Sequence, residues 1–387
     1  MYEFGSSLPE SPQAPLWEGK IDWQGDDAVL TARTDAGVTH QEKLPVESRA
    51  HATERLLALL TGGKTRVLPS QSEIAAVGHR IVNGGRDYTQ PTAITPGVKA
   101  AIRRMAVFAP LHNRVELEGI ELVERIFGGI PQIAVFDTAF HSQLPNAAAV
   151  YPGPYEWLEQ GIRRFGFHGI NHEYCAKRAA QMLGKDLLPL KLVTCHLGNG
   201  CSLAAIRNGR SVDTTMGFTP LEGLMMGTRS GSVDPGILTY LLREQNLNGQ
   251  QLDHLLNKKS GLLGISGISG DMRKIVSAMK DGNERAKLAF DIFVHRLQTG
   301  IGAMVASLGG IDVLVFTAGI GENSAEMREA ACAKLAFLGV HLEQGKNAAC
   351  KADQNISTAN SPVKSLVIQA QEDWAIACET WKLLAGR

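Results

Sequence analysis

The sequence lacks any uninterrupted apolar run of the roughly 18 residues that a membrane-spanning helix requires. Its N-terminus, MYEFGSSLPESPQAPLW, also lacks the basic stretch and apolar core of a secretory signal. The 39 basic and 39 acidic residues leave no excess charge for binding nucleic acid or an anionic membrane surface. We therefore expect a cytoplasmic protein with neither a nucleic acid nor a membrane partner.

Cysteine is sparse as well. The six cysteines of the 387-residue chain include no CxxC pair, which argues against a zinc site or a disulfide framework. A hydrophobic fraction of 44% and a charged fraction of 20% exclude a largely disordered chain. At about 150 residues per domain, the length predicts two or three domains.

Two common phosphate-binding signatures are missing, because the chain contains neither GxxxxGK[ST] nor GxGxxG. Glycine-bearing turns are nevertheless present at residues 196–200, 264–271 and 319–323. Glycine lets backbone N–H groups approach a phosphate closely, and a helix N-terminus adds a favourable dipole. Each turn alone is also typical of an ordinary connection, but together they favour a nucleotide site.

Hydrophobic patterning alternates strands with helices along the whole chain. In the first half it predicts strands at residues 16–23, 28–34, 74–82 and 133–136, and helices at 49–60, 96–106 and 114–127. In the second half it predicts strands at 192–195, 202–206, 211–214, 313–317 and 367–368, and helices at 234–244, 248–258, 271–281 and 284–307 and from 324 and 372. This order indicates two α/β domains around a cleft.

Four charged or titratable residues stand in apolar or small-residue surroundings near these turns, namely Arg80, Asp137, His168 and Arg229. An arginine in such a setting is unfavourable unless it pairs with an anion, and a structural salt bridge is the alternative to a substrate. Two arginines, a histidine and an aspartate suit phosphoryl transfer, which depends on positioning and on neutralising charge.

The motifs resemble those of the acetokinase family, the acetate, propionate and butyrate kinases. The resemblance is carried by GHRIVNGG (78–85), APLHN (109–113), VFDTAFH (135–141), RRFGFHG (163–169), HLGNGCS (196–202), DTTMGFTPLEGLMMGTRSG (213–231), GISGISGDMR (264–273), FTAGIGENS (316–324) and the weaker QAQEDWAIA (369–377). The block at 213–231 is the most specific of them.

The resemblance implies the two-domain α/β fold shared with actin, Hsp70 and sugar kinases, which is ribonuclease H-like and has a nucleotide cleft. It places the N-terminal domain at residues 1–141, joined by the C-terminal helix 374–387. The C-terminal domain, residues 142–373, would carry the ATP site and the interface of a homodimer.

The implied reaction is reversible, Mg²⁺-dependent transfer of a phosphoryl group from ATP to acetate, with Mn²⁺ as an alternative metal. Arg80 and Arg229 would hold the acetate carboxylate and the transferring phosphoryl group. His168 would donate a hydrogen bond to the transition state, Asp137 would be the essential acidic residue, and Glu372 would help to position Mg²⁺.

Further residues match the family's substrate and nucleotide contacts. The pocket around the acetate methyl group would consist of Val82, Leu111, Phe167 and Pro220. The resemblance assigns ATP or ADP contacts to His196, Leu197, Gly198, Asn199, Gly200, Asp271, Met272, Arg273, Gly319, Ile320, Gly321, Glu322 and Asn323.

The chain departs from the family at its N-terminus, where the family has a strand followed by an NxGSSSxK loop. Here no strand precedes the Gly5-Ser6-Ser7 segment and Leu8-Pro9-Glu10 follows it. We therefore expect the first strand and loop to be missing, through a misassigned start or a deletion. Gln369-Ala370-Gln371 also replaces the usual Pro-Thr-Asn before Glu372.

Three functions remain open at this point. An acetate kinase would form acetyl phosphate, whereas a nucleotide-binding protein with impaired catalysis would bind ADP without turnover. A propionate kinase would use the same motifs, since one methylene is worth only about 1–3 kcal/mol in a pocket.

Overall fold

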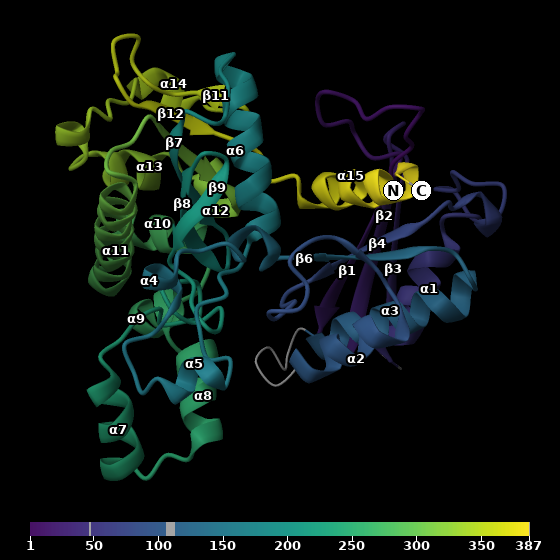
Figure 1. The fold of residues 1–387 in the computed structure, drawn as a ribbon, viewed down its shortest axis with the longest axis horizontal. Coiled ribbons are helices and arrows are strands. Elements are labelled where there is room, and N and C mark those ends of the chain that lie inside the picture. Colours follow the sequence, from purple (N-terminus) through teal and green to yellow (C-terminus); the bar gives the residue numbers. More distant parts are fainter. Residues whose placement is uncertain (46–47, 106–112, 387) are drawn as a thin grey trace. The chain divides into compact units, whose positions relative to one another are not determined.

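The computed structural model describes residues 1–45, 48–105 and 113–386, which form two compact units. The first unit contains Met1–Ala139 and Gln371–Arg387, and the second contains Phe140–Ala370. Each unit has its own sheets and helices (Figure 1). The mixed α/β structure agrees with the predicted fold class, whereas the roles assigned to the two domains stay predictions.

An antiparallel sheet and one helix make the first layer of the first unit. The sheet consists of β1 (Trp17–Gln24), β2 (Asp27–Thr34) and β3 (Thr39–Pro45) in that order, and helix α1 (Arg49–Ala58) packs on it. Buried and more exposed residues alternate along β2. Leu30 and Ala32 therefore face Leu56 of α1, and their neighbours in the strand point to the opposite face of the sheet. The predicted strands at 16–23 and 28–34 are confirmed.

A second sheet holds the strands that position the candidate site of this unit. Its strands are β4 (Val77–Ile81), β6 (Gln132–Phe136) and β5 (Thr92–Ala93) in that spatial order, and β4 and β6 run parallel. The same unit contains helices α2 (Pro96–Met105), α3 (Asn113–Phe127) and α15 (Glu372–Ala385) and the 3₁₀ turn η1 (Gln71–Glu73). Ile81 and Phe136 pack with α2 and α3 on one face. The residues next to them in each strand point to the opposite face of the sheet.

Helix α15 covers that other face of β4. A Cβ atom on Gly78 would overlap Thr380 and Ile376 of α15, so only glycine allows this close approach. Arg80 has the same parity in β4 as Gly78 and therefore lies on the side of the sheet that α15 covers. The strand thus directs a charged side chain towards the helix that begins with Glu372.

The second unit is built on a six-stranded mixed sheet. Its strands are β11 (Gln354–Asn355), β12 (Lys364–Val367), β10 (Val313–Thr317), β7 (Lys191–Leu197), β8 (Cys201–Arg207) and β9 (Arg210–Thr214), in that spatial order. β12, β10 and β7 run parallel, whereas β8, β9 and β11 pair antiparallel.

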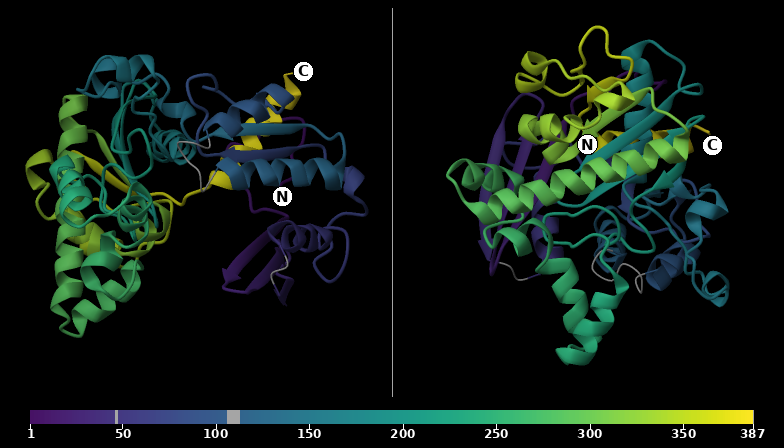
Figure 2. Two further views of the ribbon diagram at one scale, coloured as in Figure 1. Left: turned by 90° about the horizontal axis from the view of Figure 1, so that it is seen from below. Right: turned by 90° about the vertical axis from the view of Figure 1, so that its left-hand side faces the viewer.

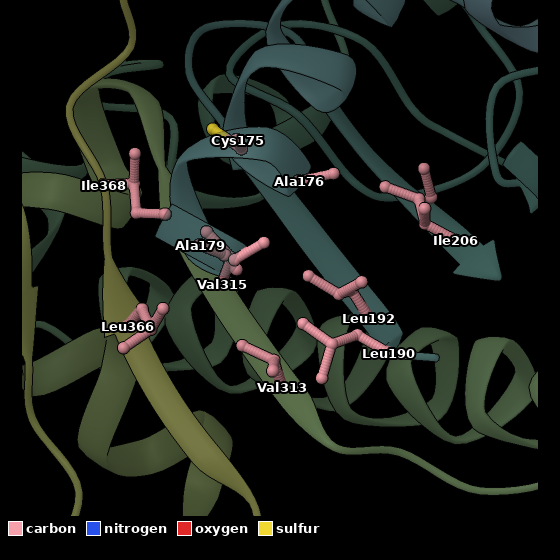
Figure 3. Packing of buried hydrophobic residues seen from close by; sticks show 12 residues of the cluster. Cys175, Ala176, Ala179, Leu190, Leu192, Ile206, Val313, Val315, Leu366 and Ile368 are labelled. Carbon is pink, nitrogen blue, oxygen red and sulfur yellow. The ribbon is translucent and has the colours of Figure 1, made fainter. Parts of the chain in front are cut away.

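Helices α6 (Gly169–Leu183) and α11 (Glu284–Leu308) cover opposite faces of this sheet (Figures 1 and 2). Ala204 and Ile206 of β8 pack with α6, whereas Leu203 would touch a Cβ on Gly300 of α11. Figure 3 shows small α6 side chains, including Ala176 and Ala179, among the aliphatic residues of the sheet.

The remaining helices of the second unit are short. They are α4 (Asn146–Ala149), α5 (Glu156–Glu159), α7 (Pro235–Glu244), α8 (Gly249–Lys258), α9 (Gly261–Ser266), α10 (Met272–Lys280), α12 (Ala318–Asn323), α13 (Ala325–Cys332) and α14 (Gln344–Ala348), with 3₁₀ turns η2 (Ala139–His141) and η3 (Ala336–Leu338). Among them, α7 and α8 have no buried residue.

Four local predictions need correction. Helix α6 and strand β3 were not predicted from the sequence, and residues 319–323 were interpreted as a turn. In the structure these residues form helix α12, which begins directly after β10. The turn at 264–271 likewise starts inside α9, because Gly267, with φ of 71°, is the residue that ends that helix.

Packing against α6 predicts the effect of a core truncation in the second unit. Leu192 is fully buried in the cluster of Figure 3, so Leu192→Ala removes buried methyl groups and leaves a cavity. We expect a loss of about 2–5 kcal/mol and a lower melting temperature in scanning calorimetry. Leu188, which is 66% exposed, is the control. Equal melting temperatures for Leu192→Ala and Leu188→Ala would contradict this packing.

Candidate functional site

Arg80 and Asp137 meet at the carboxyl ends of two parallel strands in the first unit. Arg80 lies opposite Val135 in the β4–β6 pairing, and Asp137 follows β6 directly. Asp137 is fully buried, and its backbone N–H donates to the Ile81 carbonyl at 2.9 Å. The Arg80 guanidinium pairs with both Asp137 oxygens, through Nη2 to Oδ2 and through Nε to Oδ1 at 3.2 Å. This carboxylate raises the pKa of Arg80 above its ordinary value.

Glu372, the first residue of α15, belongs to the same group of charges. Burial raises the pKa of its carboxyl to about 7, with a further contribution from the negative charge of Asp137, while Arg80 acts in the opposite direction. Its Oε1 atom is buried and has no hydrogen-bond partner. A buried carboxylate oxygen without a protein partner fits Mg²⁺, which uses one or two carboxylates and keeps water and phosphate oxygens as its other ligands.

No group of three or more His, Cys, Asp or Glu side chains that could hold a metal ion occurs within residues 1–45, 48–105 and 113–386. The described residues therefore form no complete protein cage. Glu372 is the residue that fits a metal whose remaining ligands come from substrate and water.

Glu116 on α3 is a fourth member of this group and was not predicted from the sequence. Both carboxylate oxygens accept from the backbone N–H of Val82, at 3.2 Å each. Burial raises the pKa of Glu116 to about 7, whereas the Val82 N–H and the Arg80 charge act to lower it. We refer to Arg80, Glu116, Asp137 and Glu372 as the Arg80 cluster.

In the second unit, His168 lies directly before α6 and has a left-handed backbone with φ of 59°. Non-glycine residues adopt this conformation rarely, and it is often found at functional sites. The imidazole stacks on His196, with ring centroids 3.9 Å apart and an interplanar angle of 14°. Its Nδ1 lies 2.8 Å from Ser202 Oγ. The backbone and two side chains therefore fix the orientation of this ring.

Ser202 joins two histidines. Its Oγ also lies 2.8 Å from His172 Nε2, and His172 Nδ1 lies 2.7 Å from Thr194 Oγ1. The serine hydroxyl has one proton, so it donates to one histidine and accepts from the other. Burial lowers the pKa of His172 well below its ordinary value, and a neutral His172 carries one ring proton. The tautomers of His168 and His172 are therefore coupled through one hydroxyl group.

Arg229 approaches His168 at the end of the glycine segment 196–200. A Cβ on Gly200 would lie 2.8 Å from Arg229 Nη2 and 3.4 Å from His168 Nε2, so a side chain here would displace the guanidinium from this position. Arg229 Nη1 donates to the Pro220 carbonyl at 2.6 Å. Burial lowers the pKa of the Arg229 guanidinium, which indicates a desolvated cation suited to an anionic ligand.

The three predicted glycine segments lie against one another. A Cβ on Gly198 would be 3.7 Å from Cβ of Ala318, the first residue of α12. The N–H of Gly227 donates to the Asn199 carbonyl at 3.2 Å, and a Cβ on Gly227 would lie 3.0 Å from the Gly270 carbonyl. Segments that are far apart in the sequence therefore form one glycine-lined surface in the second unit.

Arg328 holds the end of α12 and is another residue that the sequence analysis missed. It is almost fully buried, and Nη1 donates to the carbonyls of Gly321 at 2.9 Å and Glu322 at 2.8 Å. Nε and Nη2 donate to Asn347. The Glu322 carboxylate in turn accepts from the Ala370 N–H at 2.8 Å. Side-chain hydrogen bonds thus keep a glycine-rich segment helical.

The other predicted nucleotide residues flank this surface. Asp271 caps α10 by accepting from the Arg273 N–H at 2.9 Å, and their side chains form an exposed ion pair, while Met272 is buried. Asn323 donates to the Gly319 carbonyl at 2.9 Å within α12.

The remaining predicted residues are divided between the units. Val82 is buried at the end of β4, whereas Phe167 is buried beside His168, and its carbonyl accepts from His141 Nε2 at 3.1 Å. Leu111 lies outside the described residues. His172 was also missed, because the sequence did not predict the helix α6 that carries it.

Among the described residues, no helix combines the length and the apolar character needed to cross a membrane. A sequence profile of the acetokinase family matches residues 6–378. The chain is 57% identical to an acetate kinase of Cyanothece sp. over 99% of this chain and 95% of the relative. It is 59% identical to an acetate kinase of Gloeobacter violaceus over 98% and 94% of the two chains.

Two solved structures are similar in fold. The crystal structure of Porphyromonas gingivalis acetate kinase aligns with a TM-score of 0.90 and 39% identity, covering 97% of this chain and 95% of that chain. The crystal structure of a propionate kinase from Francisella tularensis aligns with a TM-score of 0.87 and 36% identity, covering 94% and 92%. The fold of these two enzymes is therefore present here over nearly the whole chain.

The buried histidines predict how stability depends on pH. Burial lowers the pKa of His141 to about 4 and that of His172 well below 6.5, the ordinary value for the unfolded chain. As pH falls below 6.5 the unfolded state binds protons that the folded state does not, so stability is lost. The histidines therefore contribute a fall in melting temperature between pH 7 and pH 5, whereas the raised pKa values of Glu116 and Glu372 contribute in the opposite direction. The histidine contribution is read from the difference between a histidine variant and the parent.

The matched comparison is His141→Asn, whose melting temperature should fall less steeply over this interval because one depressed pKa is gone. His254→Gln, at an exposed position, should keep the slope of the parent. A His141→Asn slope equal to that of the parent would show that His141 is not a buried neutral imidazole.

Proposed function

The chain belongs to the acetokinase family, and on that premise we propose that it transfers the γ-phosphoryl group of ATP to acetate. The products are acetyl phosphate and ADP, and the reaction is reversible. The observation that carries the proposal is the meeting of Arg229, His168 and Gly200 beside a glycine-lined surface. Relatives named acetate kinase at 57% and 59% identity support acetate as the phosphoryl acceptor.

The chemistry requires charge neutralisation more than a base. The acetate carboxylate is already a nucleophile, so its oxygen forms a bond to the γ-phosphorus as the bond from that phosphorus to the β–γ bridging oxygen breaks. Both reactants are anions and repel each other. In the proposed site Arg80 binds the carboxylate and Arg229 binds the transferring group, which lowers this repulsion.

His168 acts as a hydrogen-bond donor to the transferring group in this proposal. When Ser202 donates to His168 Nδ1, the ring proton resides on Nε2. That is the nitrogen near Gly200 and Arg229. Stacking on His196 holds the ring plane, so the N–H direction is set before substrate binds.

ATP would occupy the surface formed by the three glycine segments. The backbone N–H groups of residues 196–200 and α12 suit phosphate oxygens, and Asp271 to Arg273 would flank the adenosine. Glu372 would hold Mg²⁺, or Mn²⁺ in its place, through the carboxylate oxygen that lacks a protein partner. When bound, the cation neutralises phosphate charge.

The alternatives are less well supported. A propionate kinase structure is similar at 36% identity, but the relatives at 53–59% identity are named acetate kinases. The same relatives also favour an active kinase over a protein that binds nucleotide without turnover. The ratio of kcat/KM for acetate and propionate measures the preference directly.

We also propose that the protein is a cytoplasmic homodimer whose interface includes α7. Val233, Ile237, Tyr240 and Leu242 expose 37–53% of their surface on or beside this helix. α7 and α8 bury no residue and contact each other at one end of the second unit (Figures 1 and 2). Ile237 and Tyr240 lie three positions apart and so share one face of α7. An exposed apolar face indicates a covered surface, and a second copy is the commonest partner.

The two arginines give the direct test of catalysis. Arg80→Ala and Arg229→Ala remove the cations that face the two anionic groups, so acetyl phosphate formation should fall by about 10³-fold or more. The assay traps acetyl phosphate as the hydroxamate and requires ATP, Mg²⁺ and acetate. Arg103→Ala, at a side chain of α2 that is 66% exposed, is the matched control.

Wild-type rates in both arginine variants would refute the assignment of the site. A parent enzyme that forms no acetyl phosphate from acetate would refute the proposed function itself. Because folded variants are required, each protein is first compared with the parent by circular dichroism.

The dimer is tested by placing a charge on the apolar face of α7. Ile237→Asp should convert a dimer to a monomer in light scattering after size-exclusion chromatography, because a buried unpaired carboxylate opposes association. Leu188→Asp introduces the same charge at an exposed leucine outside α7 and should leave the mass of the particle unchanged. A monomeric parent, or a dimeric Ile237→Asp, would exclude this interface.

A further inference from the structure

The proposed function leaves Glu116 without a role, although its position is tightly defined. The carboxylate reaches from α3 to the backbone N–H of Val82, with both oxygens at 3.2 Å. Val82 follows Arg80 by two residues and is one of the residues assigned to the acyl pocket. A charged side chain therefore anchors the backbone where the acid substrate would bind.

The charge around Arg80 is unusual for a site that binds an anion. Asp137 pairs with the guanidinium directly, and Glu116 and Glu372 also stabilise its charged form. With all three carboxyl groups ionised, one positive charge would face three negative charges, and the cluster would carry a net charge of −2. Such a cluster would repel a carboxylate substrate, so the protonation of Glu116 affects how well the anion binds.

Among the described residues that pack on α3, the other charged side chains do not act on the Glu116 carboxyl group. Helices α1 and α2 bring three charged side chains to α3, but they pair with its more distal residues, as Glu54 with Arg125, Lys99 with Glu124 and Arg103 with Glu121. The charged groups that act on Glu116 are Arg80 from β4 and Asp137 from the end of β6.

We propose that Glu116 is a positioning residue that anchors Val82 and sets the charge that Arg80 presents to the acid substrate. The hydrogen bond holds the pocket backbone in either protonation state of the carboxyl, because one oxygen is always an acceptor. The charge opposes a second carboxylate only when Glu116 is ionised. This inference rests on the proposed function, because it takes the anion bound near Arg80 to be the phosphoryl acceptor.

The sign of the pH dependence follows from the burial of the group. Burial raises the pKa of Glu116 to about 7, so the side chain is mostly neutral at pH 6 and mostly ionised at pH 8. Acetate itself is ionised at both values. The KM for acetate should therefore increase from pH 6 to pH 8. Glu372 is the same in the parent and in variants of Glu116, so a comparison between them isolates the charge of Glu116.

The experiment compares Glu116→Gln and Glu116→Ala with the parent at pH 6 and pH 8. Glutamine keeps an oxygen for the Val82 N–H and removes the charge. We expect Glu116→Gln to lower the KM for acetate about fivefold at pH 8 and to leave it within about twofold at pH 6, with little change in kcat. Alanine loses the acceptor as well, so Glu116→Ala should have a higher KM than Glu116→Gln at both pH values.

Glu118→Gln is the control, because it removes the same charge from an exposed position on the same helix and should follow the parent. If the ratio of KM at pH 8 to KM at pH 6 is the same in Glu116→Gln as in the parent, the charge-setting role is overturned. If Glu116→Ala and Glu116→Gln have equal KM values, the anchoring of Val82 is overturned. A parent that shows no dependence on acetate overturns the proposed function and this inference together.

Discussion

The buried carboxylate of Asp137 is the constraint on which the first unit depends. An ionised carboxylate without solvent is strongly unfavourable unless a cation and hydrogen-bond donors satisfy it. The parallel pairing of β4 and β6 supplies that cation, because it brings Arg80 to the same edge of the sheet. α15 then closes on Gly78 and places Glu372 beside the pair. The sheet register, a glycine and the start of a helix therefore all contribute to the surroundings of one charged group.

In the second unit, the main feature is a histidine that is held in one orientation beside a cation. His168 has a strained backbone, a stacking partner and a hydrogen bond to Ser202. His172, behind it, is fully buried and neutral. A buried polar network of this kind favours one arrangement because every alternative leaves a donor or an acceptor unsatisfied. Rigid placement is what phosphoryl transfer requires of a hydrogen-bond donor.

Much of this fold could be predicted from sequence periodicity, and the failures have physical reasons. Helix α6 was missed because its buried face consists largely of small or polar residues, such as His172, Ala176 and Ala179, which give little hydrophobic signal in the sequence. Its N-cap side chain also makes no capping hydrogen bond. β3 was missed because its sequence, THQEKLP, has no buried residue. α12 was interpreted as a turn because of its glycines, yet Arg328 holds its carbonyls in a helix.

The site was only partly predictable for a related reason. Arg80, Asp137, His168 and Arg229 stand out in the sequence because each is polar in an apolar or small-residue context. Glu116 and Ser202 do not stand out, because their importance comes from partners 34 residues away in the chain, namely Val82 for Glu116 and His168 for Ser202. Contacts of this kind are set by tertiary packing and leave no local pattern.

The two clusters differ in charge, and the difference suits the proposed chemistry. Arg229 has no carboxylate within hydrogen-bonding distance among its described contacts, and its neighbours are the Pro220 carbonyl and the imidazole of His168. Its positive charge is therefore available to a dianionic or trianionic phosphoryl group. Arg80 instead shares its charge with three carboxyl groups, two of which have pKa values near 7. A singly charged acid needs less electrostatic attraction from the protein than a nucleotide phosphate does. A site that bound the acid more tightly than the transition state would slow the reaction.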